Sequence, residues 1–186
     1  MIALPVKRPA LGMVAAAVFG LLLVWPGAGV GAGAGGARAL VVLDFGIVDT
    51  TQGMASYRPH DEADAERLKM AAEVVREALA EHEEYRLVDH SLLEAAVEDA
   101  TEGRQHLHRC AACQLAVAEA LGAEAILAGR VHKVSNLILV MSLELREVES
   151  GETIARGQVS MRGNLDESWR RAARSLLRHH LDLIGG

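Results

Sequence analysis

Aromatic side chains are scarce in this chain of 186 residues. Phe, Trp and Tyr together make up 3% of it. So few rings cannot supply the repeated stacking platforms that proteins use to bind bases, and platforms for sugars are equally improbable in such a chain. The hydrophobic core must instead be built from Leu, Val, Ile, Ala and Met.

Positive charge is also in short supply. Lys and Arg number 19 against 25 Asp and Glu, which gives a formal net charge of −6 at pH 7. Residues 1–34 contain Lys7 and Arg8 but no acidic residue, so removal of that segment would bring the charge to −8. Because nucleic-acid binding needs a basic face, we expect no nucleic-acid partner.

The N-terminus has the three parts of a secretory signal peptide. Lys7 and Arg8 precede an uncharged apolar run at residues 11–25 (LGMVAAAVFGLLLVW), and small residues follow it. The triplet Ala32-Gly33-Ala34 suits cleavage near Ala34. A membrane-spanning helix needs about 20 apolar residues, so an uncleaved N-terminal anchor is the lesser alternative. No cysteine lies nearby to make this a lipoprotein signal.

We therefore predict export to the periplasm, with no stable membrane insertion after cleavage. The predicted organisation is a signal peptide at residues 1–34, a short linker at 35–37 and one globular α/β domain at 38–186. Residues 31–36 read GAGAGG, which has the spacing of a dinucleotide-binding fingerprint. That fingerprint works between a strand and a helix, and here the glycines precede a strand, so we expect no nucleotide site.

The remaining pattern predicts strands and helices in the order β-α-β-α-α-β-β-β-α. Residues 39–48 (ALVVLDFGIV) read as one buried strand. The spacing of Leu68, Ala72, Val75 and Leu79 indicates a helix within residues 61–82. Ser91 and Glu94 resemble a capping box, with Leu92 and Leu93 among the inward residues, and Asn164 is expected to cap the last helix. The other predicted elements are a strand at 85–88, a helix at 111–121, strands at 125–134, 137–148 and 153–162, and a last helix through 184.

This order is typical of an α/β (α+β) domain, with helices packed on a mixed sheet and a C-terminal antiparallel meander of three strands. Apolar and polar residues alternate cleanly along the meander, which indicates that one of its faces is wet. Arg130, Arg146, Arg156 and Arg162 would lie there. We interpret them as a candidate docking face, against the plainer interpretation of a solvated surface.

Both cysteines lie in residues 106–114, HLHRCAACQ. In an exported protein, Cys110 and Cys113 are expected to form a disulfide at the start of a helix. Gln114 excludes the C-x-x-C-H haem motif, and the absence of any proline after Pro59 argues against thioredoxin-like exchange. A zinc or copper site, or a redox carrier, using His106, His108, Cys110 and Cys113 remains the alternative, although four ligands in so short a segment would be crowded.

Four sequence features carry a resemblance to known proteins. They are the export signal, the ALVVLDF opening, C-x-x-C before AEALGAEAILAGRV, and the ending SGE…RGNLDESWRRAARSLL. Together they resemble a family of small secreted bacterial proteins of unknown function. The opening strand and the LGA segment are also similar to envelope domains, among them the N-terminal domain of TolB, the curli secretion protein CsgG and lipoprotein activators of peptidoglycan synthases.

The resemblance implies a periplasmic accessory role and offers no catalytic residues. The implied partner is another envelope or periplasmic protein, and the occurrence of some family members beside quinoprotein alcohol-oxidation systems points to one of that kind. Asp44, the one polar residue of the first strand, is expected to cap a helix or to pair with an arginine. Since no catalytic constellation is evident, we predict a non-catalytic protein-binding module that requires no cofactor.

Overall fold

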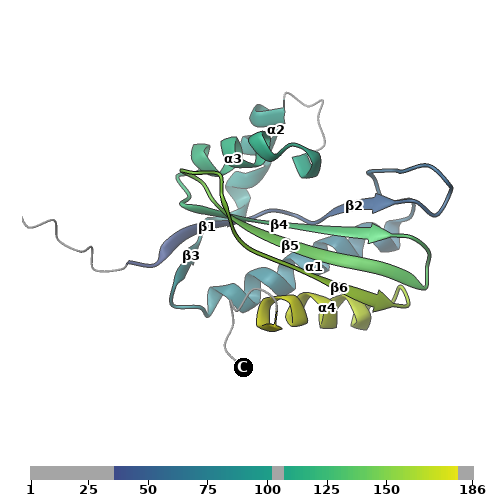
Figure 1. Ribbon diagram of the computed structural model, residues 1–186. Helices are drawn as coiled ribbons and strands as arrows, with labels where there is room; N and C mark the ends of the chain where they lie inside the picture. The colour runs from purple at the N-terminus through teal and green to yellow at the C-terminus, as the bar shows by residue number, and fades with distance from the viewer. Residues whose placement is uncertain (1–35, 102–106, 180–186) are drawn as a thin grey trace, which may run out of the picture. The chain divides into compact units, whose positions relative to one another are not determined.

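The computed structural model describes residues 36–101 and 107–179. In this part of the chain, helices pack on both faces of a six-stranded mixed sheet (Figure 1), which confirms the expected fold class. The predicted signal peptide lies outside the described residues. The elements are β1 (Arg38–Val42), β2 (Gly46–Asp49), α1 (Glu62–Ala80), β3 (Tyr85–Leu87), α2 (Leu93–Thr101), α3 (Ala111–Ala120), β4 (Ala125–Lys133), β5 (Ile138–Glu147), β6 (Thr153–Arg162) and α4 (Asp166–His179).

The strands are ordered β3-β1-β4-β5-β6 across the sheet. Strand β1 is parallel to both of its neighbours, β3 and β4. These parallel pairs are joined by crossovers through helices, α1 in the first case and α2 with α3 in the second. Strands β4, β5 and β6 then pair antiparallel as the predicted meander. The parallel half therefore needs helices on both faces, whereas the meander can leave one face open.

The first predicted strand is divided in two, which corrects the single strand expected at residues 39–48. Both halves pair with β4, with Leu40 opposite Ala125 in β1 and Gly46 opposite Arg130 in β2. Between them, Phe45 packs its ring over Gly129 of β4, where an added Cβ would lie 2.5 Å from the ring. The residues around Asp44 are apolar enough to predict one continuous strand. In the structure the strand is interrupted between Val42 and Gly46, where the Phe45 ring lies over Gly129 and Asp44 is exposed.

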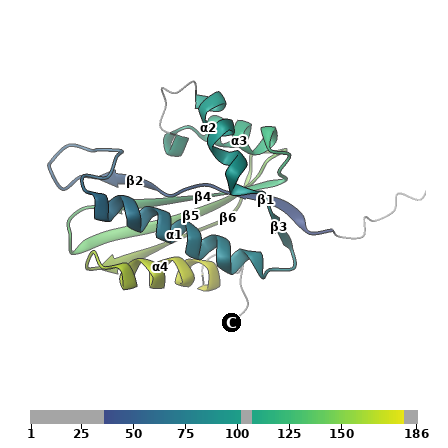
Figure 2. The same cartoon turned by 180° about the vertical axis from the view of Figure 1, so that it is seen from behind.

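The helices form two unequal layers, which Figure 2 shows from behind. Helices α1 and α4 lie side by side against one face and enclose the main core, which includes Trp169, Leu139 and Leu143. Helices α2 and α3 cover only the part of the other face that contains Val41 and Ile126. The rest of that face, on β4, β5 and β6, has no helix over it in the described chain. No helix within those residues is long and apolar enough to cross a membrane.

Two expected helix caps are wrong. Ser91 lies inside a short 3-10 turn at His90–Leu92, and the side chain of Asp89 accepts the hydrogen bond that begins this turn. As a result Leu92 is 55% exposed, although it was expected to point inward. Asn164 does not cap α4, because its side chain bonds to Asp64 and Trp169 instead.

Candidate functional site

The open half of the sheet brings together three of the four arginines predicted to form a docking face. The register sets Arg130, Ser142 and Gln158 side by side across β4, β5 and β6. The next row contains Glu144 opposite Arg156, and Arg146 follows along β5. Arg162 is exposed on β6 but lies six positions beyond Arg156, about 20 Å along the strand. It does not line the hollow that the other three share.

Two adjoining hollows of about 370 and 660 Å³ cross this face. They share several lining residues, so they form one continuous depression, which we call the trough. Its floor runs along β5 from Val140 to Arg146, and its sides are formed by Arg109, Arg130, Arg156 and Gln158.

Arg109 belongs to this site, although the sequence pattern did not reveal it. It ends a 3-10 turn at Leu107–Arg109 and stacks over the ring of Tyr57 at 4.3 Å from the centroid. Gln114 fixes this turn against α3, because its buried amide donates a hydrogen bond to the carbonyl of Leu107 at 3.1 Å. Nothing in the spacing of residues 101–109 indicates that Arg109 would face a sheet more than 15 positions away in the chain.

Glu144 is the one acidic residue that lines the trough. Its Oε1 accepts hydrogen bonds from Arg146 at 2.9 Å, from Arg156 at 3.2 Å and from the hydroxyl of Thr153 at 2.7 Å. Partial burial acts to raise the pKa of Glu144, but Thr153 and Arg146 together with the charge of Arg156 lower it on balance. Glu144 therefore stays ionised at neutral pH and orients two arginines, which is not the state of a general acid.

The structure joins Cys110 and Cys113 by a disulfide across the start of α3, with their Cα atoms 5.1 Å apart. The Sγ of Cys110 also accepts a hydrogen bond from the backbone N–H of Cys113, so Cys110 caps the start of α3. In this oxidised form, neither sulfur is a thiolate that could bind a metal. The imidazole of His108 packs on Gly46 of β2.

His106, the fourth residue of the alternative metal set, lies outside the described residues. Within them, no three His, Cys, Asp or Glu side chains gather where they could hold a metal ion. The zinc, copper or redox alternative thus stays a prediction for the reduced chain.

A second hollow of about 580 Å³ lies beside Asp44, between His90, the start of α2 and His108. Asp44 accepts a hydrogen bond from Arg76 at 2.5 Å, and His90 lies 3.6 Å away. Its carboxylate is thus paired with an arginine of α1, one of the two arrangements that the sequence favours. The Asp44 side chain is 57% exposed, so it is open to solvent and not enclosed in the hollow.

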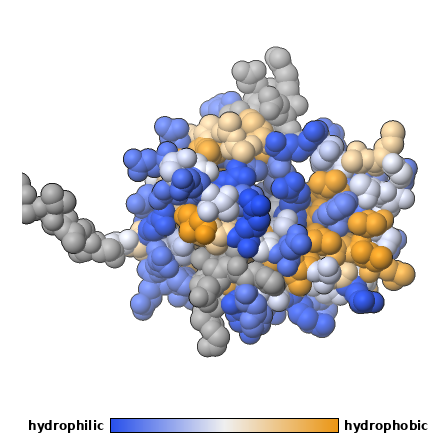
Figure 3. All heavy atoms as spheres, in the orientation of Figure 1, coloured by the Kyte–Doolittle hydropathy of each residue, from blue (hydrophilic) through white to orange (hydrophobic). Residues whose placement is uncertain are grey.

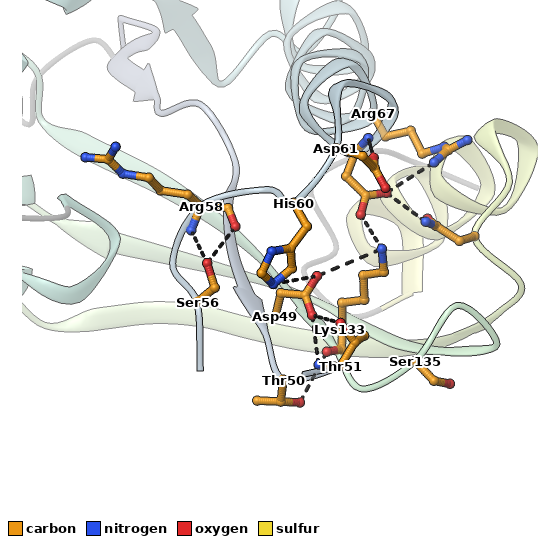
Figure 4. Close-up of polar contacts among 12 residues, drawn as sticks. Asp49, Thr50, Thr51, Ser56, Arg58, His60, Asp61, Arg67, Lys133 and Ser135 are labelled. Atoms are coloured by element: carbon orange, nitrogen blue, oxygen red, sulfur yellow. Dashed lines mark hydrogen bonds and ion pairs between the residues drawn. The ribbon is translucent and has the colours of Figure 1, made fainter. Parts of the chain in front are cut away.

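A buried polar cluster at the far end of the sheet was not foreseen at all (Figure 4). Lys133, at the end of β4, makes a close ion pair with Asp64 of α1 and lies 3.9 Å from Asp49 of β2. All three side chains are almost completely buried. Asp64 also binds Arg67 at 3.1 Å and Asn164 at 2.7 Å. Through these contacts the cluster joins β2, β4, α1 and the loop that precedes α4.

Asp64 is ionised within this cluster. Burial acts to raise its pKa, but hydrogen bonds from Lys133 and Asn164, and the charge of Lys133, bring the pKa below its ordinary value. The neighbouring Asp49 bonds through Oδ1 to the backbone and hydroxyl of Thr51, at 2.9 and 2.7 Å. The Oδ2 atom of Asp49 accepts no hydrogen bond in the described structure and faces the ring nitrogen of His60 at 3.8 Å.

Exposed apolar side chains gather at the end of the sheet where β4 runs into β5, which is at the right of Figure 3. Leu137 is 73% exposed there and Ile138 56% exposed, with Val134 beside them in sequence. Leu137 accepts a backbone hydrogen bond from Gly163, which brings the two loops at this end together. The trough is different in character, since charged and polar side chains dominate it.

Comparison with known proteins gives a family and several similar folds. No curated protein is similar enough in sequence to match. Among solved structures, the LpoB C-terminal domain from Salmonella enterica is 20% identical, with a TM-score of 0.48, over 70% of this chain and 87% of that one. Lipoprotein GNA1162 from Neisseria meningitidis is 15% identical, with a TM-score of 0.46, over 68% and 82%. TolB from Acinetobacter baumannii is 11% identical, with a TM-score of 0.42, over 75% and 26%.

At these identities the likeness to solved structures concerns the fold alone. The match to a family model is more specific. It covers one continuous stretch that includes every described helix and strand, and it confirms the resemblance to a family of unknown function. Residues 38–181 match the DUF3280 model, described as "Protein of unknown function (DUF2380)", and the chain belongs to that family.

Proposed function

We propose that this chain is an exported, non-catalytic binding module of the cell envelope, and that it holds another envelope protein against the open half of its sheet. The observation that carries the proposal is the trough, where arginines from three strands and one turn converge on a face that no described helix covers. Side chains on strands are held more precisely than side chains on loops, which suits recognition of a partner.

The chemistry of the trough favours binding over catalysis. Glu144 is committed to arginines and held ionised, and the remaining polar groups that line it are guanidinium, amide, hydroxyl and imidazole groups. A partner protein can use all of these through hydrogen bonds and ion pairs. The export and periplasmic location rest on the sequence of residues 1–34, and the association with a quinoprotein alcohol-oxidation system rests on the resemblance alone.

Site-directed photo-crosslinking in cells that naturally make the chain tests this proposal. Benzoylphenylalanine would replace Gln158, which is exposed at the trough, and in a control would replace Arg174, which is exposed on the outer side of α4. We expect one adduct of defined mass from position 158 and none from position 174. The proposal is overturned if position 158 gives no adduct, or if both positions give the same set.

A further inference from the structure

The charge of the trough is opposite to that of the whole chain. Arg109, Arg130, Arg146 and Arg156 line it, with Glu144 as the one acidic residue, so its formal charge is +3 when its histidines are neutral. The chain as a whole has a formal charge of −6. A positive depression attracts a negatively charged partner, whereas the net negative charge that every copy of the protein carries opposes the approach of one copy to another.

Two of these arginines are available to a ligand. Arg146 and Arg156 are already paired with Glu144. Arg109 is stacked on Tyr57, which engages the face of the guanidinium and leaves its N–H edges free to donate. Across residues 36–101 and 107–179, no acidic side chain lies within ion-pairing distance of Arg109 or Arg130. Both residues line each of the two hollows, so they occupy the middle of the trough.

The shape of the trough fits an extended chain better than a small ion. Its floor follows β5 from Val140 to Arg146, a distance of about 20 Å at the rise of a β-strand. An extended peptide of about six residues would span that length. One end offers apolar and aromatic contacts from Val48, Val140 and Tyr57, whereas the other end is lined by Arg146 and Arg156.

We propose that the trough binds an extended acidic segment of a partner protein, whose carboxylates pair with Arg109 and Arg130 and whose apolar side chain rests near Tyr57. This inference rests on the proposed function and adds the chemistry of the partner. Guanidinium groups can bind carboxylates through two parallel hydrogen bonds, which gives direction as well as affinity.

Fluorescence anisotropy with the full chain and a labelled peptide tests the inference. The peptide would have about six residues alternating glutamate and threonine, matched to the span of the trough. A second peptide would have glutamine at each glutamate position. We expect the glutamate peptide to bind at least about tenfold more tightly, because each charge-assisted hydrogen bond lost corresponds to about that factor. Raising the salt concentration from about 50 to about 300 mM should weaken the binding of the glutamate peptide.

Matched variants locate the binding site. Arg130→Gln should lower the affinity for the glutamate peptide about tenfold. The control, Arg174→Gln, removes the same charge from the outer side of α4 and should change this affinity less than twofold. Equal affinity for the two peptides, or equal effects of the two variants, would overturn the inference. So would displacement of the peptide by stoichiometric inorganic phosphate, or stronger binding to vesicles of phosphatidylglycerol than to the peptide.

The two proposals fail in different ways. If Gln158 crosslinks a partner but the glutamate peptide does not bind, the acidic segment is wrong and the binding module stands. If Gln158 crosslinks nothing in cells, the binding module itself fails, whatever the peptide does.

Discussion

Replacement of Lys133 by methionine should strongly destabilise the domain, because it removes a cation that two buried carboxylates share. The Lys133 side chain is 4% exposed, and those of Asp64 and Asp49 are fully buried. Removal of one partner of a buried ion pair costs about 3–5 kcal/mol. Asp64 keeps its bonds to Arg67 and Asn164, so we expect the lower end of that range, about 3 kcal/mol. For a domain of this size, that loss lowers Tm by about 6–12 °C.

Urea denaturation followed by circular dichroism at pH 7 measures the loss of stability. Lys69→Met is the matched control, because Lys69 pairs with Glu66 at 3.0 Å but both side chains are about two-thirds exposed. We expect its unfolding midpoint to equal that of the original chain, since exposed pairs contribute little. A cost below about 1 kcal/mol for Lys133→Met would refute the reasoning, because it would mean that water already reaches the carboxylates.

A double-mutant cycle separates the ion pair from the packing around it. In Asp64→Asn, the amide oxygen can still accept from Arg67 and Asn164, but the charge that Lys133 neutralises is gone. Combining Asp64→Asn with Lys133→Met should therefore cost less than the sum of the two single changes, by more than about 1 kcal/mol. Additive costs would show that the two residues stabilise the domain independently.

Three further changes test other parts of the structure. Gly129→Ala should cost about 1–3 kcal/mol in urea unfolding, since its Cβ would meet the Phe45 ring, and a neutral result would disprove that contact. Reduction of the Cys110–Cys113 disulfide should cost about 2 kcal/mol and add the mass of two hydrogens, whereas a chain isolated with free thiols would contradict the disulfide. The pKa of Asp64 is lowered on folding, so the ionised carboxylate should stabilise the folded chain fully well above pH 3.8. This stabilisation should be lost as the pH falls through the folded pKa of Asp64. If the stability of an Asp64→Asn variant falls just as steeply with acid, the reasoning is wrong.

The local patterns of the sequence predicted most of the fold, because apolar periodicity and turn residues act over a few positions. The strand predicted at residues 153–162 coincides with β6, and most other predicted elements agree within a few residues. The exceptions are the strand at 39–48, which is divided, and the predicted end of the last helix at residue 184, which lies outside the described residues. The errors arose where a distant contact competes with the local signal. Asn164 has the spacing of a helix cap, but the buried carboxylate of Asp64, 100 positions earlier in the chain, binds its amide instead.

The candidate site was predictable only in part for the same reason. Alternation along β4, β5 and β6 was sufficient to place Arg130, Arg146 and Arg156 on one face. It could not show that Arg162 would lie outside the hollow that the other three arginines line, or that a turn before α3 would bring Arg109 to the same depression. The buried ion pair of Lys133 and Asp64 joins residues 69 positions apart, and neither residue is unusual in its own segment.

Two features that the sequence did not predict, the ion pair of Lys133 with Asp64 and the position of the turn that carries Arg109, explain why the trough can be a rigid site. At one end of β4, Lys133 ties the sheet to α1, and at its other side Gln114 and the disulfide of α3 hold the turn that carries Arg109. Arg130 lies on β4 between these two fixed points. Because the backbone that carries the arginines is held before any partner arrives, binding would require little ordering of the main chain around the trough, and most of the ordering cost would fall on the extended partner segment. The HLHRCAACQ segment thus contributes to the proposed site because it positions Arg109 at the trough. The disulfide between Cys110 and Cys113 stabilises the start of α3 directly after Arg109.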